Sequence, residues 1–290
     1  MEKLCGNCEG KDMTFEGALE YGKEILQKAG VADTDLDAWY LMEYACKMDK
    51  SRYYLVSNDE MADEKFLEYE LLLRKRAERV PLQYITGSQE FMGLEFKVNS
   101  HVLIPRQDTE TLVEEALKVL EPGMEVLELC TGSGCVIISL LKQKEIRGTA
   151  SDISKQALLI AKENARNNQV EPRLVRSDLF QNITGIYDMI IANPPYIPTG
   201  TIETLMPEVK NFEPIEALDG GEDGLYFYRE IVRQSKEFLK SNGYLCLEIG
   251  HDQGGRVAFL MEENGYRNVR VMKDLAGNDR VVRGNLPSVK

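Results

Sequence analysis

The chain has 290 residues, 43% of them hydrophobic, and carries a formal net charge of −13 at pH 7 with a sequence pI near 4.9. This length and hydrophobic content are ordinary for a globular protein with one large domain or a large and a small one, and they exclude a disordered chain. The acidic charge argues against non-specific nucleic-acid binding, which needs a basic surface, and favours a cationic or neutral ligand.

The N-terminal stretch contains Cys5 and Cys8, two of the six cysteines. A structural zinc site needs four ligands, and no second pair follows at a suitable spacing, so no metal site is predicted. Cys130, Cys135 and Cys246 sit in apolar stretches, which is typical of reduced thiols. The sequence has no leader-like segment and no apolar run of about 18 residues, and a cytoplasmic protein without membrane contact is therefore expected.

Residues 14–79 show the helical spacing of apolar side chains, which predicts a small helical domain over residues 1–80. Pro81 ends the last helix, and residues 83–98 alternate around glycines, which predicts a hairpin linker over residues 81–100. The last helix ends in four basic residues: Arg74, Lys75, Arg76 and Arg79. We expect these side chains to be an ordinary solvent-exposed helix end. The less favoured alternative is a basic patch that binds an acidic partner.

From Pro122 onward, strand-like and helix-like segments alternate. Strands are predicted over residues 124–130, 148–153, 173–177, 187–193 and 244–249, with helices between them. This alternation is typical of a parallel sheet with helices on both faces. The short segments 266–273 and 279–283 lie close together in the sequence, so the sheet is expected to end in an antiparallel pair. Residues 101–290 are therefore predicted to form one α/β domain.

The first predicted strand ends in Glu128 and leads into a helix through a tight turn. That turn consists of Cys130, Thr131, Gly132, Ser133 and Gly134. In an open parallel sheet a ligand binds beyond the carboxyl ends of the strands, and glycines let it approach the backbone at a helix N-terminus. A dinucleotide fingerprint would place a third glycine where Ile137 stands, and Glu128 would repel a pyrophosphate, so nicotinamide cofactors are disfavoured.

Two carboxylates follow at the ends of the next two strands. Asp152, twenty residues after Gly132, is suited to accept hydrogen bonds from both hydroxyls of a ribose. Asp178 offers a carboxylate to an adenine amino group, and Leu179 and Phe180 offer apolar side chains to its faces, although the same residues suit a turn capped by Asp178. A nucleoside cofactor with a positive centre and no phosphate points to S-adenosylmethionine.

The strand over residues 187–193 ends abruptly in Asn193-Pro194-Pro195-Tyr196. Neither proline can donate a ladder hydrogen bond, and a residue before proline avoids the helical region, so the chain must leave the sheet at Asn193. The Asn193 side-chain carbonyl, the Pro194 backbone carbonyl and the Tyr196 ring are then expected around one small planar group, such as an amide or an amino nitrogen. The alternative is a pair of prolines that merely ends a core strand.

An ordered set of motifs closely resembles the HemK family, the protein-(glutamine-N5) methyltransferases of peptide-chain release factors, over about residues 15–284. The motifs are Leu103-Ile104-Pro105-Arg106, Thr131-Gly132-Ser133-Gly134, Asn193-Pro194-Pro195-Tyr196, Ala217-Leu218-Asp219-Gly220-Gly221-Glu222-Asp223-Gly224, Leu247-Glu248-Ile249-Gly250 and Asp279-Arg280-Val281-Val282. The resemblance implies an α/β fold, a class I (Rossmann-like) methyltransferase domain with a seven-stranded sheet and a small N-terminal helical domain that docks release factors. The implied substrate is the glutamine of a Gly-Gly-Gln motif in a release factor.

The resemblance also assigns site residues. Contacts with S-adenosylmethionine are expected from Cys130, Thr131, Gly132, Ser133, Gly134, Asp152, Leu179 and Asn193, and the strand-end position of Asp178 adds that residue. The glutamine is expected to lie against Asn193, Pro194, Pro195 and Tyr196, with Asn193, Pro194 and Tyr196 catalytic. This chain departs from the family where Gln107-Asp108 replaces the usual Pro-Glu and where Leu179 replaces a frequent stacking aromatic.

Two other functions stay open on the sequence. The Asn-Pro-Pro-Tyr tetrapeptide also occurs in methyltransferases that modify amino groups of nucleic acids, such as adenine N6, but the acidic charge and the lack of a basic face disfavour that substrate. The second alternative function is that of a catalytically silent module, which docks on ribosome-bound release factors. With the glutamine methyltransferase assignment, the expected partners are release factors and no nucleic acid, and a monomer is expected.

Overall fold

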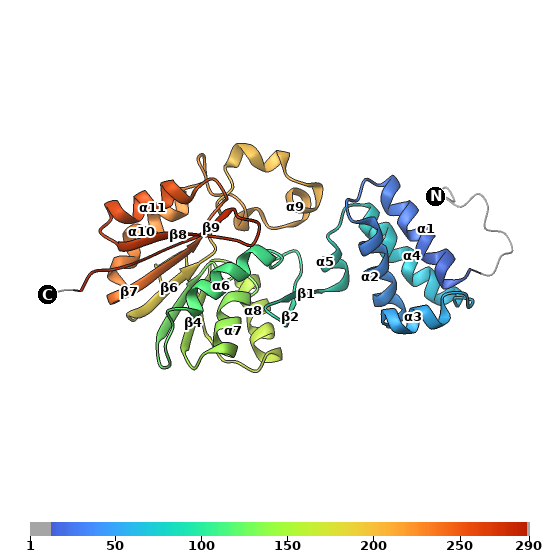
Figure 1. The fold of residues 1–290 in the computed structure, drawn as a ribbon, viewed down its shortest axis with the longest axis horizontal. Helices are drawn as coiled ribbons and strands as arrows, with labels where there is room; N and C mark the ends of the chain where they lie inside the picture. The colour runs from blue at the N-terminus through green and yellow to red at the C-terminus, as the bar shows by residue number, and fades with distance from the viewer. Residues whose placement is uncertain (1–12, 289–290) are drawn as a thin grey trace. The chain divides into compact units, whose positions relative to one another are not determined.

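The computed structural model describes residues 13–288, and the chain divides into two compact units between Thr86 and Gly87 (Figure 1). Cys5 and Cys8, and with them the question of a zinc site, lie outside the described residues. Within the described range, no helix has both the length and the apolar character that a bilayer span requires.

The first unit is a bundle of helices, as predicted. Its elements are α1 (Phe15–Lys28), α2 (Thr34–Cys46), α3 (Lys50–Val56), α4 (Asp63–Ala77) and α5 (Leu82–Thr86). The Thr14 side chain accepts a hydrogen bond from the Gly17 N–H and caps α1. The fully buried Tyr69 of α4 donates a hydrogen bond from its hydroxyl to the Ala38 carbonyl of α2 (3.0 Å). The bundle therefore has its own core.

The four basic residues at the end of α4 do not form one exposed patch. Arg76 is buried and pairs with Asp37 of α2 at 2.7 Å. Arg79 donates a hydrogen bond to the Gly30 carbonyl, and Arg74 pairs with Glu70 one turn earlier. The prediction of a solvated helix end is therefore wrong for Arg76, because helical spacing turns that side chain toward α2.

The second unit begins with a β-hairpin, β1 (Ser88–Phe91) and β2 (Leu94–Lys97). Phe91 and Phe96 are buried in the core of this unit. The strand pattern predicted from residue 83 is wrong for the first residues, because Leu82–Thr86 are helical and the Pro81 carbonyl accepts hydrogen bonds that start that turn. Pro81 stands immediately before α5, where its missing N–H leaves no helical hydrogen bond unmade.

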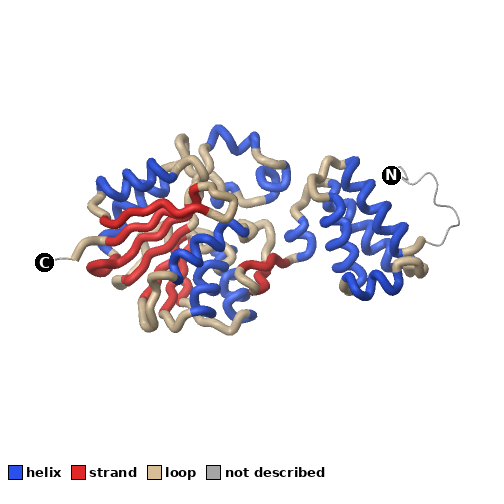
Figure 2. Tube along the Cα trace, viewed as in Figure 1, coloured by secondary structure: helices blue, strands red, loops and turns tan. Residues whose placement is uncertain are grey.

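The rest of the second unit is a seven-stranded sheet covered by helices on both faces (Figures 1 and 2). Its strands are β3 (Glu125–Leu129), β4 (Arg147–Asp152), β5 (Arg173–Arg176), β6 (Tyr187–Ala192), β7 (Leu239–Glu248), β8 (Arg267–Lys273) and β9 (Asp279–Asn285). Its helices are α6 (Glu110–Leu117), α7 (Cys135–Gln143), α8 (Lys155–Asn167), α9 (Pro207–Phe212), α10 (Tyr226–Gln234) and α11 (Gly254–Glu263), with short 3-10 turns η1 (Gln107–Thr109), η2 (Thr199–Thr204), η3 (Ile215–Ala217) and η4 (Ser235–Glu237).

The strand order is β5-β4-β3-β6-β7-β9-β8, parallel except at β9, which runs antiparallel to β7 and β8. This confirms the predicted parallel sheet and its antiparallel end. Alternate residues of each central strand enter two cores. Val126 and Ile191 pack with α6 and α7, whereas Leu127 and Ile190 pack with α10 and α11. Burial on both faces explains why these strands are continuous apolar runs in the sequence.

The strand order reverses between β3 and β6, because the chain moves outward through β4 and β5 and then returns to β6. Leu129 is in register with Ala192 across these two strands, so the glycine turn and Asn193 leave the sheet side by side. Such a reversal opens a crevice at the carboxyl ends of the strands. The fold therefore brings the predicted cofactor and acceptor residues to one edge of the sheet.

Candidate functional site

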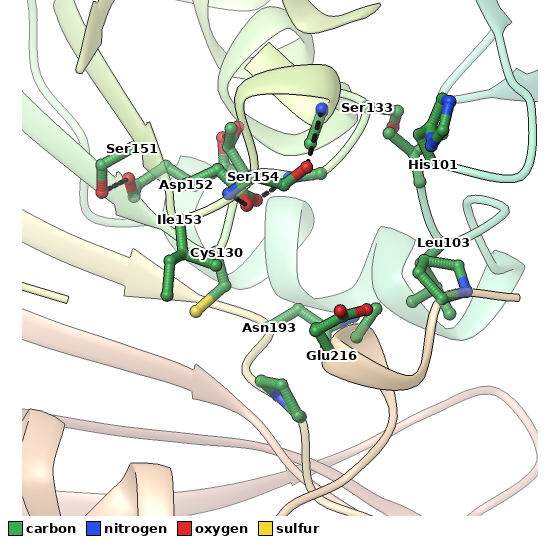
Figure 3. Close-up of a pocket in the computed structure, with 18 of the residues that line it drawn as sticks. His101, Leu103, Cys130, Ser133, Ser151, Asp152, Ile153, Ser154, Asn193 and Glu216 are labelled. Atoms are coloured by element: carbon green, nitrogen blue, oxygen red, sulfur yellow. Dashed lines mark hydrogen bonds between the residues drawn. The ribbon is translucent and has the colours of Figure 1, made fainter. Parts of the chain in front are cut away.

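A cavity of about 750 Å³ lies at this edge of the sheet (Figure 3). Its volume is within the roughly 300–1,000 Å³ of small-molecule sites. The residues from the strand ends that line it include Cys130, Thr131, Gly132, Ser133, Asp152, Asp178, Leu179, Asn193 and Pro195. His101 and Leu103, from the segment before η1, also line the cavity. The structure thus brings together residues from both predicted sites.

The turn after β3 bends through three left-handed residues, Cys130 (φ 55°), Gly132 (φ 53°) and Gly134 (φ 81°). A Cβ on Gly134 would meet Ala161 of α8 at 3.2 Å, so this glycine allows α8 to pack closely. A Cβ on Gly132 would meet no protein atom within 4 Å. Because Gly132 lines the cavity, its bare backbone is open to a ligand, and Gly134 serves the packing of the turn instead.

Glu128, at the end of β3, is a buried carboxylate beside this turn. It is 3% exposed and accepts hydrogen bonds from the Thr131 hydroxyl and the Ile137 N–H. Burial raises the pKa of Glu128 to about 8, because the charged form is poorly solvated. Glu128 also lines the cavity, so a cationic ligand would favour its charged form and an anionic one would be repelled.

Asp152 ends β4 and is held by two backbone donors. Its Oδ2 accepts a hydrogen bond from the Gly132 N–H (2.9 Å) and its Oδ1 from the Ser154 N–H (2.8 Å). Burial raises the pKa of Asp152 above its ordinary value, and these two donors oppose that rise. A carboxylate has about four lone-pair sites, so both oxygens can still accept a hydrogen bond from a ligand hydroxyl.

Asp178 and Leu179 line the cavity after β5, but Phe180 does not. Phe180 is 3% exposed and stacks on Phe238 at 4.8 Å between ring centroids, so the prediction that it faces a ligand is wrong. Leu179 adopts φ 44°, a left-handed conformation that a branched side chain rarely takes. A second apolar side chain comes from Ile153, which is 53% exposed and which the motifs did not reveal.

Asn193 follows β6 and is partly buried in the cavity wall. Its Nδ2 donates a hydrogen bond to the Thr109 hydroxyl oxygen at 3.3 Å. Pro195 also lines the cavity, whereas Pro194 is buried and Tyr196 is half-buried, and neither belongs to the cavity lining. Contacts of Pro194 and Tyr196 with an acceptor therefore stay predictions.

The Asn193–Tyr196 segment is fastened by Gln253. Gln253 Nε2 donates to the Tyr196 carbonyl (3.0 Å) and to the Gly224 carbonyl (3.2 Å). Its Oε1 accepts from the Gly250 N–H and the Tyr228 hydroxyl. A Cβ on Gly224 would come within 2.4 Å of the Tyr196 carbonyl oxygen, so the glycine-rich loop packs directly on this segment.

An ion pair that no sequence motif indicates joins the cavity wall to the residue that follows α9. Arg106, which lines the cavity, pairs with Glu213, whose side chain is 1% exposed. These residues are 107 positions apart, so no local pattern links them. In the described part of the chain, no group of three or more His, Cys, Asp or Glu residues is placed to hold a metal ion.

Comparison with known proteins identifies the family. A family model described as the PrmC N-terminal domain matches residues 17–87, and one described as the methyltransferase small domain matches residues 107–207. The release factor glutamine methyltransferase of Geobacter sulfurreducens is 38% identical over 275 residues, covering 94% of this chain and 97% of that protein. This chain belongs to the release factor glutamine methyltransferase family.

Other relatives agree with this membership. The release factor glutamine methyltransferase of Moorella thermoacetica is 41% identical over 275 residues, covering 92% of this chain and 97% of that protein. A methyltransferase of known structure from Pyrococcus furiosus is similar at a TM-score of 0.52 and 19% identity, covering 67% of this chain and 90% of that chain. The resemblance predicted from the motifs is therefore confirmed, and so is the methyltransferase fold.

Asp108, which belongs to the Gln107-Asp108 pair that replaces the family's usual Pro-Glu, forms an ion pair in this chain. Asp108 pairs with Arg280 at 3.0 Å, and Arg280 also pairs with Asp274 at 3.1 Å. Arg280 belongs to the Asp279-Arg280-Val281-Val282 motif on β9, so this contact joins the segment before α6 to the antiparallel end of the sheet. The carboxylate of Asp108 is thus paired with an arginine in this chain.

Proposed function

We propose that this protein transfers a methyl group from S-adenosylmethionine to the side-chain amide nitrogen of the glutamine in the Gly-Gly-Gln motif of peptide-chain release factors. The observation that carries this proposal is the position of Asn193, an amide side chain in the wall of the cavity that the glycine turn and Asp152 also line. Family membership supports it, since the relatives are named for this reaction.

The residues of the cavity fit a cationic nucleoside cofactor. Five acidic side chains line the cavity, Glu128, Asp152, Asp178, Glu216 and Asp219, against the basic Arg106, Lys155 and Arg176. Asp152 would hold the ribose, Asp178 the adenine amino group, and Leu179 and Ile153 the faces of the adenine. When bound, S-adenosylmethionine supplies an electrophilic methyl group on a positively charged sulfur.

Asn193 would act on the acceptor amide. An amide nitrogen is a poor nucleophile because its lone pair is delocalised, as the barrier of roughly 18–20 kcal/mol to peptide C–N rotation shows. Asn193 Oδ1 and the Pro194 carbonyl, by accepting the two N–H bonds of the glutamine amide, would raise the electron density on its nitrogen and direct it. Holding the two reactants in line can contribute about 7–11 kcal/mol of barrier lowering. The proton leaves after transfer, because a methylated amide cation is a strong acid.

The two rival functions have weaker support. An enzyme that modifies amino groups in nucleic acid needs a basic face, and this chain carries a net charge of −13. A silent docking module would need neither a cavity nor carboxylates at three successive strand ends. Incubation with labelled S-adenosylmethionine and a cell extract separates the three: we expect one labelled protein that contains Gly-Gly-Gln, and labelled nucleic acid or no label would contradict the proposal.

Loss of the helical unit is expected to impair the reaction on whole release factors. A variant that lacks residues 1–86 should keep its affinity for the cofactor, because every residue of the cavity lies in the second unit. Its kcat/KM on an intact release factor should fall by about 10-fold or more, because docking energy that positions the glutamine is lost.

A short Gly-Gly-Gln peptide is the matched control substrate for this truncation. The truncated and full-length proteins should methylate the peptide equally well, since the peptide cannot reach a separate docking surface. Equal kcat/KM on the intact release factor would show that the helical unit does not dock the substrate.

A further inference from the structure

Glu248 is a buried carboxylate at the end of β7, next to Asn193. It is 1% exposed, and within the described residues its Oε2 has no hydrogen-bond partner. Ala192 and Leu247 are in register across β6 and β7, so Asn193 and Glu248 are the next residues on neighbouring strands. Burying a carboxylate here costs free energy, because the charged group loses its hydration. An apolar residue would fill the same space without that cost, so the carboxylate is expected to have a function.

Thr109 connects these two side chains. It is 2% exposed, lines the cavity and accepts the hydrogen bond from Asn193 Nδ2. The Thr109 hydroxyl also acts on the Glu248 carboxylate, where it favours the charged form and lowers the pKa of that group. A hydroxyl carries a single proton. Since Thr109 uses a lone pair to accept from Asn193, its proton stays available for the Glu248 carboxylate, which has an oxygen without a partner among the described residues.

We propose that Thr109 and Glu248 are positioning residues that hold the Asn193 side chain with Oδ1 toward the acceptor amide. This inference rests on the proposed function, in which Asn193 Oδ1 accepts an N–H bond of the glutamine. A charged Glu248 has no proton to give, so it fixes the direction of the Thr109 hydroxyl. That hydroxyl in turn fixes which end of the Asn193 amide faces the cavity.

Protonation of Glu248 reverses this chain of hydrogen bonds. A neutral carboxyl can donate to Thr109, which can then donate to Asn193 Oδ1 and turn the NH₂ group of Asn193 toward the acceptor. That group repels the N–H bonds of the glutamine amide. The arrangement that accepts the substrate amide therefore requires a charged Glu248.

Burial raises the pKa of Glu248 to about 7, and the hydroxyls of Thr109 and Tyr196 oppose the rise. Arg280 favours the charged form and Asp108 disfavours it. Tyr228 and Cys135 also lie near this carboxylate. Since the active form is the charged one, the rate of methyl transfer at saturating cofactor should fall as the pH falls through about 7.

The test compares Thr109→Val, Thr109→Ser and Glu248→Gln in the full-length protein, with single-turnover methylation of a release factor from pH 5.5 to 9 as the readout. Thr109→Val should lower the rate roughly 10- to 100-fold with little change in KM, because only the orientation of the Asn193 side-chain amide is lost. Thr109→Ser, which keeps the hydroxyl, should restore most of the rate. Glu248→Gln should lower the rate at high pH and abolish its decline at low pH. Thr184→Val, an exposed position outside the cavity lining, is the matched control and should leave the rate unchanged.

A double-mutant cycle separates positioning from general packing. If Thr109 acts through Asn193, Thr109→Val should cost nothing further in an Asn193→Ala background. An equal loss in both backgrounds, or a Thr109→Ser variant as slow as Thr109→Val, would overturn the positioning role while the methyltransferase function stands. A wild-type protein that does not methylate release factors would overturn both.

Discussion

Asn193→Ala is expected to lower the single-turnover rate of release-factor methylation by roughly 10²–10³-fold, the usual loss when one oriented hydrogen-bonding group is removed from an active site. The fold should survive, because Asn193 lies beyond the end of β6 and its side chain makes a single hydrogen bond, to Thr109, among the described contacts. Cofactor affinity should largely survive too, since Asp152 and the glycine turn remain.

Asn193→Asp provides the sharper chemical comparison. It keeps the size of the side chain and an acceptor oxygen, yet it should also fail at pH 7. A carboxylate at this position is attracted to the positive sulfur of the bound cofactor and stabilises the state before transfer, which opposes the reaction. Rapid-quench measurement with saturating cofactor decides both cases. Near-normal turnover of Asn193→Ala would refute the role of Asn193, even if the methyltransferase assignment survived.

Asp152→Ala is expected to weaken S-adenosylmethionine binding by about 1.5–3 kcal/mol, the scale of hydrogen bonds to a charged group. This is roughly a 10- to 150-fold rise in Kd. Asp152 also accepts a hydrogen bond from the Gly132 N–H. Its removal therefore loosens the turn that borders the same cavity, which should raise the cofactor Kd further. Calorimetry on a folded variant provides the measurement, and an unchanged Kd would remove Asp152 from the cofactor site.

The pH dependence of binding gives a second test of Asp152. Burial raises its pKa, and ribose hydroxyls donate more strongly to its charged form, so affinity should be full above this pKa and should weaken as the pH falls through it. Asp35→Ala on α2 is the control, because Asp35 is exposed and lies outside the cavity. Its Kd should follow that of the wild-type protein at every pH.

The sequence was sufficient for the centre of the sheet, because central strands such as β3 and β6 are buried on both faces and therefore stand out as apolar runs. The ends of those runs then predicted which polar residues meet at one edge, and Asp152, Asp178 and Asn193 all line the cavity. Parallel strands have their carboxyl ends at the same edge of the sheet. The local pattern at each strand end therefore predicted which residues, far apart in the sequence, meet in space.

Other features depended on contacts that no local pattern encodes. Arg76 was expected to be exposed, yet it pairs with Asp37, 39 positions earlier. Phe180 was expected beside a ligand, yet it stacks on Phe238 across the core. Glu248 was recognised only as part of a motif, because a carboxylate that ends an apolar strand gains meaning from Asn193 and Thr109, which lie on other elements.

Methylation of a purified release factor, located by tandem mass spectrometry, tests the central claim most directly. The protein, S-adenosylmethionine and the release factor should yield one added methyl group on the side-chain amide of the Gly-Gly-Gln glutamine, and a release factor with that glutamine replaced by alanine should stay unmodified. A methyl group on another residue, or methylation of nucleic acid in place of the release factor, would contradict the account.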